Sequence, residues 1–321
     1  MLVSAATLRQ TRGVRPVLLV LAASLCFGTT GTALALAGSA DPIAFGAVRV
    51  ALGGTVLALV ALLLARRSSR APRAPRARVA APVVVLGALG VVAYQPAFFT
   101  GTSTNGVALG TIVALGSAPV LTGLAQWVLT RRFPGPSWAV ATLLALVGLA
   151  LLTGAGGAGV GGVHPLGVLS SLGAGAAYAV YTLVSKRLLD AGWSPPEAMG
   201  LLFGLAALGG VALLVLVART SDLAWLGLSR GLGAAVWAAL VTIVLAYLLF
   251  ARGLERLPGS RVATLTLAEP LTATILGVAV LGERLGAVEI AGLAVLAAGL
   301  AVLLPAVAGR IDRMLEPSAP A

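Results

Sequence analysis

The sequence predicts an all-α membrane protein with ten transmembrane helices in two inverted five-helix repeats. Three observations lead to this prediction: the composition, the spacing of the apolar segments, and an internal similarity between the two halves of the chain. Hydrophobic residues make up 59% of the 321 residues and charged residues only 10%, with a mean hydropathy of +1.03. Soluble domains carry roughly 25% charged residues. The chain is therefore expected to lie within a lipid bilayer.

Ten apolar segments are long enough to cross a hydrocarbon core of about 30 Å, which takes about 20 residues of helix. The predicted spans are 16–37, 42–65, 79–100, 105–129, 137–154, 165–188, 196–218, 231–251, 260–281 and 286–305. Short polar or Gly- and Pro-containing segments separate them, and these segments predict the turns.

The basic residues predict how these spans are oriented. If both termini are cytoplasmic, eighteen Lys and Arg residues fall on cytoplasmic segments and only Arg219, Arg230 and Arg284 fall outside, as the positive-inside rule requires. The eighteen are Arg9, Arg12, Arg15, Arg66, Arg67, Arg70, Arg73, Arg76, Arg78, Arg131, Arg132, Lys186, Arg187, Arg252, Arg256, Arg261, Arg310 and Arg313. The net charge of +12 is thus interpreted as an orientation signal that also attracts anionic headgroups, and no nucleic-acid partner is expected.

An internal repeat appears when the chain is shifted by 151 residues. Phe27 then falls on Tyr178, Pro119 on Pro270, and Gly148-Leu149-Ala150 on Gly299-Leu300-Ala301. Because each half holds five spans, an odd number, the second half enters the membrane from the opposite side, as in many secondary transporters. The predicted units are a cytoplasmic segment 1–15, a first repeat 16–154, a Gly-rich linker 155–164, a second repeat 165–305 and a cytoplasmic tail 306–321.

Several features of the second half occur in a recognisable order. They are Tyr178, Tyr181, Lys186-Arg187, Ala268-Glu269-Pro270 and Leu281-Gly282-Glu283-Arg284. In two tandem copies over about 16–305, they resemble the EamA-type repeat of the drug/metabolite transporter superfamily. The resemblance implies ten transmembrane helices, inverted five-helix repeats and transport of metabolites, often export. The turn after the fourth span departs from the family's usual Gly-Glu pair and reads Thr130-Arg131-Arg132, which suits a cytoplasmic loop.

Two charged side chains lie inside predicted spans. Glu269 lies about 15 Å into the membrane, counted from Ser260 at 1.5 Å per residue. Intramembrane carboxylates are rare and usually functional, so Glu269 is predicted to bind a substrate cation or to couple transport to protons; a neutral structural role is the alternative. Arg49, about 10 Å from the outer end of its span, could pair with Glu269 or receive a substrate carboxylate. It could equally snorkel outward or form a fixed salt bridge.

Prolines and polar aromatic residues supply the other candidates. Pro119 and Pro270 occupy corresponding places and are predicted to kink two helices that gate or line a cavity, unless they are simple packing kinks. The other polar or aromatic groups within the predicted spans are Tyr94, Gln95, Gln126, Tyr178, Tyr181 and Tyr247. Of these, Tyr178, Tyr181, Tyr94 and Gln95 are the candidates for the cavity wall. Interhelical hydrogen bonding is their alternative role. Tryptophans at span ends are expected as interfacial anchors; they are Trp127, Trp138, Trp193 and Trp225.

The sequence therefore predicts a multi-pass secondary transporter of the inner membrane that moves a small metabolite by alternating access. An amino acid or related compound is one candidate substrate, and export follows from the resemblance alone. A passive channel or a lipid-handling protein is the alternative, and a membrane-embedded enzyme is a distant third, because the chain has no HExxH motif and a single histidine. No cofactor and no metal are expected, and the oligomeric state is left open.

Overall fold

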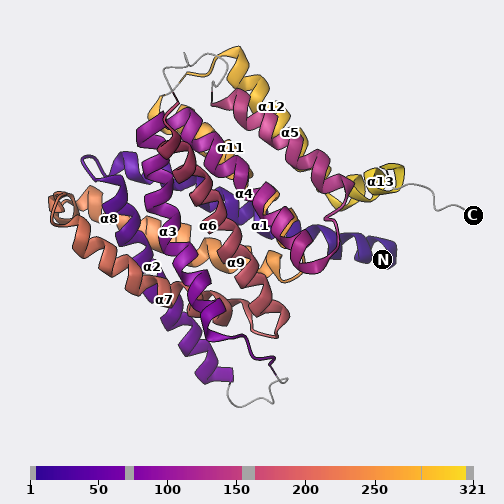
Figure 1. Cartoon of the computed structure of the whole chain (residues 1–321), viewed down its shortest axis with the longest axis horizontal. Helices are drawn as coiled ribbons and strands as arrows, with labels where there is room; N and C mark the ends of the chain where they lie inside the picture. Colours follow the sequence, from indigo (N-terminus) through magenta and orange to yellow (C-terminus); the bar gives the residue numbers. More distant parts are fainter. Residues whose placement is uncertain (1–4, 69–75, 154–162, 283, 316–321) are drawn as a thin grey trace, which may run out of the picture.

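The computed structural model describes residues 5–68, 76–153, 163–282 and 284–315, and helices account for nearly all of the regular structure in these ranges (Figure 1). Most of the predicted linker 155–164, the ends of the chain and Glu283 lie outside the described residues.

The helices of the first half match the five predicted spans closely. They are α1 (Ala5–Leu36), α2 (Pro42–Ser68), α3 (Ala81–Asn105), α4 (Val107–Thr130) and α5 (Pro136–Leu152). Only α1 begins well before its predicted start. The turn between α3 and α4 is tight: Gly106 alone separates them and has φ +81°, a conformation that glycine adopts without strain.

The second half contains three interruptions of regular α-helix. Its elements are α6 (Pro165–Asp190), α7 (Pro195–Val217), η1 (Ala224–Gly227), α8 (Ser229–Ala239), η2 (Leu240–Leu245), α9 (Ala246–Leu254), α10 (Gly259–Leu265), α11 (Ala268–Leu281), α12 (Ala287–Val302) and α13 (Pro305–Leu315). The π-helical turn η2 joins α8 to α9, and a short break separates α10 from α11. Eight segments are long and apolar enough to cross a membrane, and α5 and α12 are shorter apolar helices.

Two pairs of helices from opposite halves pack closely and run antiparallel. In α5 and α12, a Cβ on Gly299 would lie 2.8 Å from Ala145 N, and one on Gly292 would lie 2.5 Å from Leu152 N. Gly292, the earlier glycine of α12, faces Leu152, and the later Gly299 faces the earlier residue Ala145. The two helices therefore run in opposite directions. Small residues allow this close approach, and Figure 1 shows the pair side by side.

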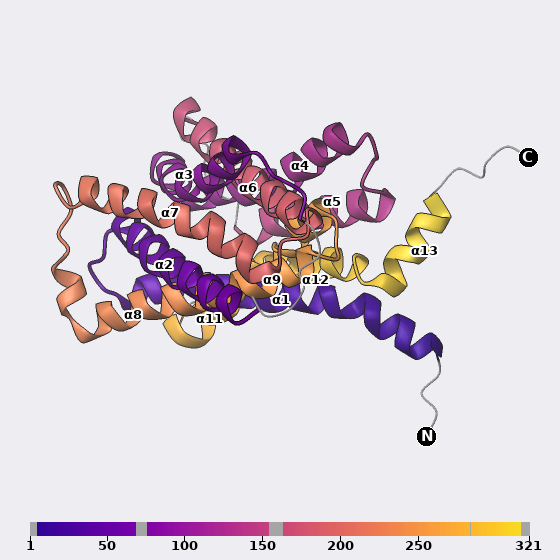
Figure 2. The same ribbon diagram turned by 90° about the horizontal axis from the view of Figure 1, so that it is seen from below.

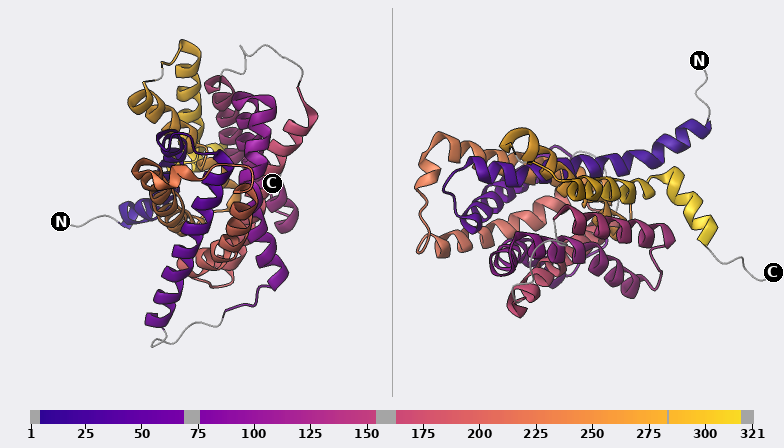
Figure 3. Two further views of the ribbon diagram at one scale, coloured as in Figure 1. Left: turned by 90° about the vertical axis from the view of Figure 1, so that its left-hand side faces the viewer. Right: turned by 90° about the horizontal axis from the view of Figure 1, so that it is seen from above.

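The second antiparallel pair is α2 with α7. A Cβ on Gly200 would lie 2.9 Å from Leu57 O, and one on Gly210 would lie 3.2 Å from Ala47 O. Other helices also pack across the halves: α3 and α4 pack on α6, while α1 packs on α8, α9 and α11. Figures 2 and 3 show that the start of α1 and the helix α13 leave the bundle on the same side.

The expectation that all four tryptophans are interfacial anchors is wrong for two of them. Trp225 is 2% exposed and packs on Phe45, with ring centroids 5.8 Å apart. Trp138 is 7% exposed and packs on Phe133 at the same centroid distance. Both rings fill spaces between helix ends, so they contribute to the core, whereas Trp127 stays exposed.

Candidate substrate-binding site

The site is organised around the break between α10 and α11. Pro270 has no N–H and so cannot donate to the carbonyl of Thr266, four residues earlier. That carbonyl instead accepts from Glu269 N at 2.9 Å, three residues on, and Leu267 N donates to Thr264 O at 3.1 Å. These hydrogen bonds span three residues instead of four, so the helix is tightened at this point. Helix α11 begins at Ala268, two residues before the proline, and Glu269 lies in its first turn.

Neighbouring helices supply hydrogen bonds to the broken backbone and its flanking hydroxyl. Ser24 Oγ of α1 donates to Leu265 O at 3.4 Å while also bonding Val20 O at 2.9 Å. Tyr178 OH of α6 lies 2.8 Å from Thr266 Oγ1. Irregular backbone at membrane depth is tolerated only where protein groups or a wet cavity satisfy it. Here Ser24 of α1 bonds the backbone itself, and Tyr178 of α6 bonds the hydroxyl beside it.

Glu269 lies against the first helix of the chain. A Cβ on Gly28 of α1 would lie 2.8 Å from Glu269 O and 2.5 Å from Thr272 Cβ, so α1 and α11 approach closely at this point. The Glu269 side chain is half-buried. Its place in the first turn of α11 also favours a negative charge, because helix N-termini carry a partial positive charge.

Arg49 of α2 is buried near this break and does not snorkel to the surface. Its side chain is 9% exposed, and Nη1 donates to Thr30 Oγ1 at 3.1 Å and to Thr242 Oγ1 at 3.4 Å. The two threonines donate to Phe27 O and Ala238 O, each at 2.6 Å, and so present lone pairs to the arginine. Thr242 belongs to η2, and π-helical turns often occur at functional sites.

The two charges are near each other without forming a pair. Electrostatic interaction links Arg49 with Glu269 and with Tyr94 of α3. Among the ion pairs of the described residues, none joins Arg49 to Glu269. The fixed salt bridge between them, one of the roles considered from the sequence, is therefore absent from this conformation.

The tyrosines form an aromatic cluster that crosses the interface between halves. The rings of Tyr178 and Tyr181 lie 5.0 Å apart, as their spacing on one helix face predicted. Tyr247 donates to Tyr181 OH at 3.2 Å, and its ring lies 4.9 Å from that of Phe27 on α1. Their hydroxyls thus make interhelical hydrogen bonds, the alternative role that the sequence left open.

The other candidates lie at the edge of this arrangement. Tyr94 is half-buried and stacks on Phe98 at 6.0 Å. Gln95 is 6% exposed and faces Gly46 of α2, whose Cβ would lie 3.2 Å from the Gln95 amide carbon. Pro119 is buried within α4, which is a continuous helix there. The structure thus brings Glu269, Arg49 and the tyrosines together, and Ala118, next to Pro119, packs in the same core as Tyr178 and Tyr181.

Two hollows lie at opposite ends of the bundle. The larger, about 1050 Å³, runs between α1, α8 and α11 and includes Thr29, Thr32, Trp237 and Leu276 in its wall. Trp237 Nε1 donates to Thr29 Oγ1 at 3.0 Å across it. Thr29 in the wall of this groove directly precedes Thr30, which accepts the hydrogen bond from Arg49.

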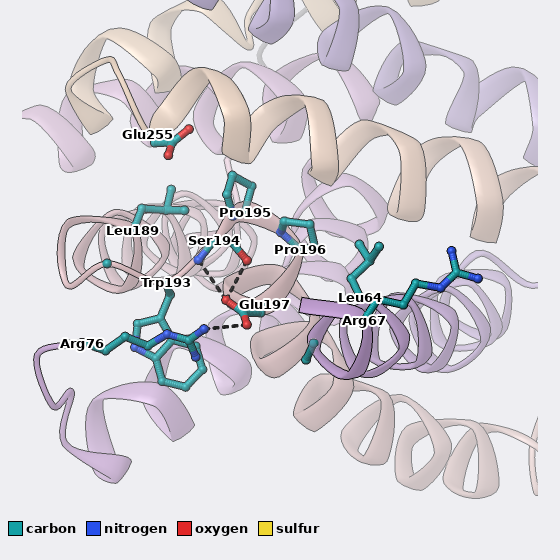
Figure 4. A pocket seen from close by; sticks show the side chains of 12 residues that line it. Leu64, Arg67, Arg76, Leu189, Trp193, Ser194, Pro195, Pro196, Glu197 and Glu255 are labelled. Atoms are coloured by element: carbon teal, nitrogen blue, oxygen red, sulfur yellow. Dashed lines mark hydrogen bonds and ion pairs between the residues drawn. The ribbon is translucent and has the colours of Figure 1, made fainter. Parts of the chain in front are cut away.

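The smaller hollow, about 710 Å³, contains a contact between the halves (Figure 4). Arg76 Nη2, before α3, lies 2.6 Å from Glu197 Oε1 of α7, and its guanidinium carbon is 5.1 Å from the centre of the Trp193 ring. Ser194 donates through N and Oγ to Glu197 Oε2 at 3.1 and 2.7 Å, a capping box for α7. We call this cluster the Arg76 latch.

A second contact between halves lies at the start of α5. Asp312 of α13 accepts from Ser137 N at 2.9 Å and from Ser137 Oγ at 3.2 Å. Arg261 of α10 lies 3.3 Å from the same carboxylate. This Asp312 cluster ties the last helix to α5 of the first half and to the beginning of the broken span.

Comparison with known proteins agrees with these features. The model of the EamA-like transporter family matches the chain twice, over residues 14–154 and 165–304. The chain belongs to the EamA-like transporter family. It is 41% identical over 288 residues to the uncharacterized transporter YwfM of Bacillus subtilis (strain 168), which covers 89% of this chain and 92% of that protein. A solved crystal structure, 22% identical, superposes with a TM-score of 0.74 over 94% of this chain and 99% of that one.

Membership makes this protein a multi-pass membrane transporter of small molecules, and it confirms the resemblance inferred from the sequence. The residues that the sequence reasoning missed in this EamA-family transporter are Ser24, Thr30, Thr242 and Thr266, with Tyr247 noticed only as a polar aromatic group. Hydroxyls in apolar helices commonly bond to their own backbone, so they carry little signal. Thr30 and Thr242 are distant in sequence, and only the fold brings both to Arg49.

Proposed function

We propose that this EamA-family protein is an inner-membrane secondary transporter that moves a small metabolite by alternating access. An amino acid or a related compound is the first substrate to test, and export is the favoured direction. One observation carries the proposal: the α10–α11 break places Glu269 against α1 and close to the buried Arg49, which forms no ion pair with any residue in the described ranges. Secondary transporters bind substrate at such discontinuous helices, near the midplane and between repeats.

The antiparallel packing of corresponding helices supports an inverted repeat of five plus five spans. Helices α2 and α7 hold the second place in their halves, and α5 and α12 the fifth. Corresponding helices that run in opposite directions are what an inverted repeat requires. With 17 and 16 residues, α5 and α12 are about 25 Å long, which a locally thinned bilayer accommodates.

The charge distribution supports a cytoplasmic location for both termini, with the units 1–15, 16–154, 155–164, 165–305 and 306–321 proposed from the sequence. In this orientation the groove between α1, α8 and α11 opens outward. The Arg76 latch and the Asp312 cluster then join the halves on the cytoplasmic side. Opening to the cytoplasm would break both contacts and close the groove.

Glu269 is proposed to bind a cationic group of the substrate or to carry a coupled proton, with Tyr94, Tyr178, Tyr181 and Gln95 around the path. Pro270 maintains the break in its helix. Pro119 is proposed to contribute flexibility to α4.

The proposal is tested by counterflow in proteoliposomes with a panel of metabolites that begins with amino acids. The parent should show saturable counterflow, and Glu269→Gln should lose about tenfold or more of the rate, as expected for loss of a charge-assisted hydrogen bond. Glu289→Gln is the matched control, because Glu289 also lies in the first turn of an apolar helix of the second half. It should behave like the parent.

Contrary results are specific. Flux without counterflow would indicate a channel, and no flux with the whole panel would contradict metabolite transport. An unchanged rate and pH dependence in Glu269→Gln would remove this residue from the mechanism.

A further inference from the structure

We propose that Arg49 is an anion-binding residue, which receives a carboxylate or another small oxyanion carried by the substrate. This inference rests on the proposed transport function and specifies the chemistry of its site. It starts from an observation that transport alone does not explain: a buried arginine whose hydrogen-bonding capacity is only partly used.

Among the described residues, the Arg49 guanidinium has hydrogen-bond partners on Nη1, and its Nε is buried without one. The edge formed by Nε and Nη2 is one of the two edges through which arginine binds a carboxylate with two parallel hydrogen bonds. Thr30 and Thr242 hold the group from the opposite side, so that edge is oriented in advance.

The buried positive charge of Arg49 also favours the binding of an anion beside it. Burying a cation is unfavourable unless an opposite charge and further hydrogen bonds compensate it. The two threonines are neutral, and Glu269 does not pair with Arg49 among the described residues. The empty site is therefore short of one negative group next to Arg49, and a substrate oxyanion would supply it.

The groove between α1, α8 and α11 shares helix α1 with this position. Thr29 and Thr32 line the groove of about 1050 Å³, and Thr30 lies between them on α1. Rotation of the Thr30 turn, or loss of the Trp237–Thr29 hydrogen bond, would connect the groove to the arginine. The same groove carries the exposed Arg230 at its rim, which provides a matched control.

Arg49 could alternatively serve only to tie α1, α2 and η2 together. The two roles predict opposite effects on the empty protein. A purely structural arginine would make Arg49→Met destabilising. An arginine kept for its ligand would leave the empty protein as stable as the parent or more stable, since replacing a buried charge by an apolar side chain is often neutral or stabilising.

The test is thermal unfolding of the purified protein in detergent at constant ionic strength, titrated with acetate, benzoate or inorganic phosphate. Acetamide and benzamide are the uncharged counterparts. We expect at least one oxyanion to raise the melting temperature saturably in the parent and in Arg230→Met, with no effect of the amides. Arg49→Met should lose this response without a lower melting temperature when empty. Stronger stabilisation by benzoate would indicate a carboxylate substrate, and by phosphate a phosphorylated one.

A second variant keeps the test decisive if Arg49→Met does not fold. Thr242→Val preserves the arginine but removes one of its supports, and it should weaken oxyanion binding about tenfold. The inference is overturned if no oxyanion stabilises the parent, if Arg49→Met responds like the parent, or if Thr242→Val binds unchanged.

The experiments distinguish a failure of the anion-site proposal from a failure of the transport proposal. Oxyanion binding that depends on Arg49, without counterflow of any compound, would refute the carrier and keep the anion site. Counterflow of anionic substrates that Arg49→Met leaves intact would refute the anion site and keep the carrier.

Discussion

The fourth helix of the first half and its counterpart in the second carry the same proline and respond to it differently. Helix α4 runs unbroken from Val107 to Thr130 through Pro119, whereas the corresponding span divides into α10 and α11 just before Glu269-Pro270. A shift of 151 residues places Pro119 on Pro270. A proline in a membrane helix therefore does not decide by itself whether the helix breaks.

The surroundings of the two prolines supply the reason. Around the break, Tyr178 bonds Thr266 and Ser24 bonds Leu265 O. The same shift of 151 residues places Tyr178 on Phe27 and Thr266 on Leu115, both of which are apolar. It places Ser24 on Gly175. A Cβ on Gly175 would lie 3.0 Å from Ala114 O, and that carbonyl accepts from Ser117 Oγ of its own helix at 3.2 Å. The broken helix thus receives hydrogen bonds from hydroxyls of two neighbouring helices, Ser24 of α1 and Tyr178 of α6, whereas the positions that correspond to these two residues beside Pro119 are a glycine and a phenylalanine. Lipid cannot provide such hydrogen bonds.

Replacing each proline by alanine tests this contrast most strongly. Pro270→Ala should allow α10 and α11 to join, which moves Glu269 and reduces the counterflow rate about tenfold or more, in proportion to a lost charge-assisted contact. Pro119→Ala should restore one backbone hydrogen bond in α4 and stabilise the protein by about 1 kcal/mol. Because it removes flexibility from α4 but moves no charged group, it should lower the rate less than Pro270→Ala does. Counterflow and thermal unfolding measure both effects. Equal losses of rate in the two variants would refute the distinction between the helices.

Removing the hydroxyl that supports the break should have an intermediate effect. Tyr178→Phe leaves Thr266 without its partner from α6 and should destabilise the protein by about 1 to 2 kcal/mol, the usual range for a buried hydrogen bond. Thermal unfolding in detergent measures it. Tyr94→Phe is the control, because Tyr94 contributes a stacked ring on Phe98. If the two variants have the same melting temperature, the hydroxyl of Tyr178 does not support the break.

The smallest difference between α4 and α11 is at their C-terminal caps. Helix α4 ends at Arg131 with φ +57°, and α11 ends at Gly282 with φ +74°, again 151 residues apart. Left-handed caps favour glycine. Arg131→Gly should therefore raise the free energy of unfolding by up to about 1 kcal/mol, while Arg132→Gly, one residue on, should not. A decrease in melting temperature for Arg131→Gly would contradict this.

Most of the fold could be predicted, but only part of the site. The apolar segments are long and sharply bounded by Gly, Pro and Arg, so most of the described helices overlap the segments that the sequence predicted; eight segments are long and apolar enough to span a membrane, and α5 and α12 are shorter. Glu269 and Arg49 were recognisable because a charge in an apolar segment is conspicuous. The η2 turn, the threonines at Arg49 and the buried state of Trp225 had no comparable signal, because each depends on which helix packs next to it.

Composition and periodicity alone thus specified a helical membrane protein, its segments and its two charged candidates, because the absence of water makes hydrophobicity and charge dominant within each segment. Helix packing decided which proline breaks its helix, which hydroxyls meet the arginine, and that the acid and the arginine stay unpaired. Those outcomes depend on contacts between residues far apart in the chain, such as Arg49 with Thr30 and Thr242, which local patterns do not encode.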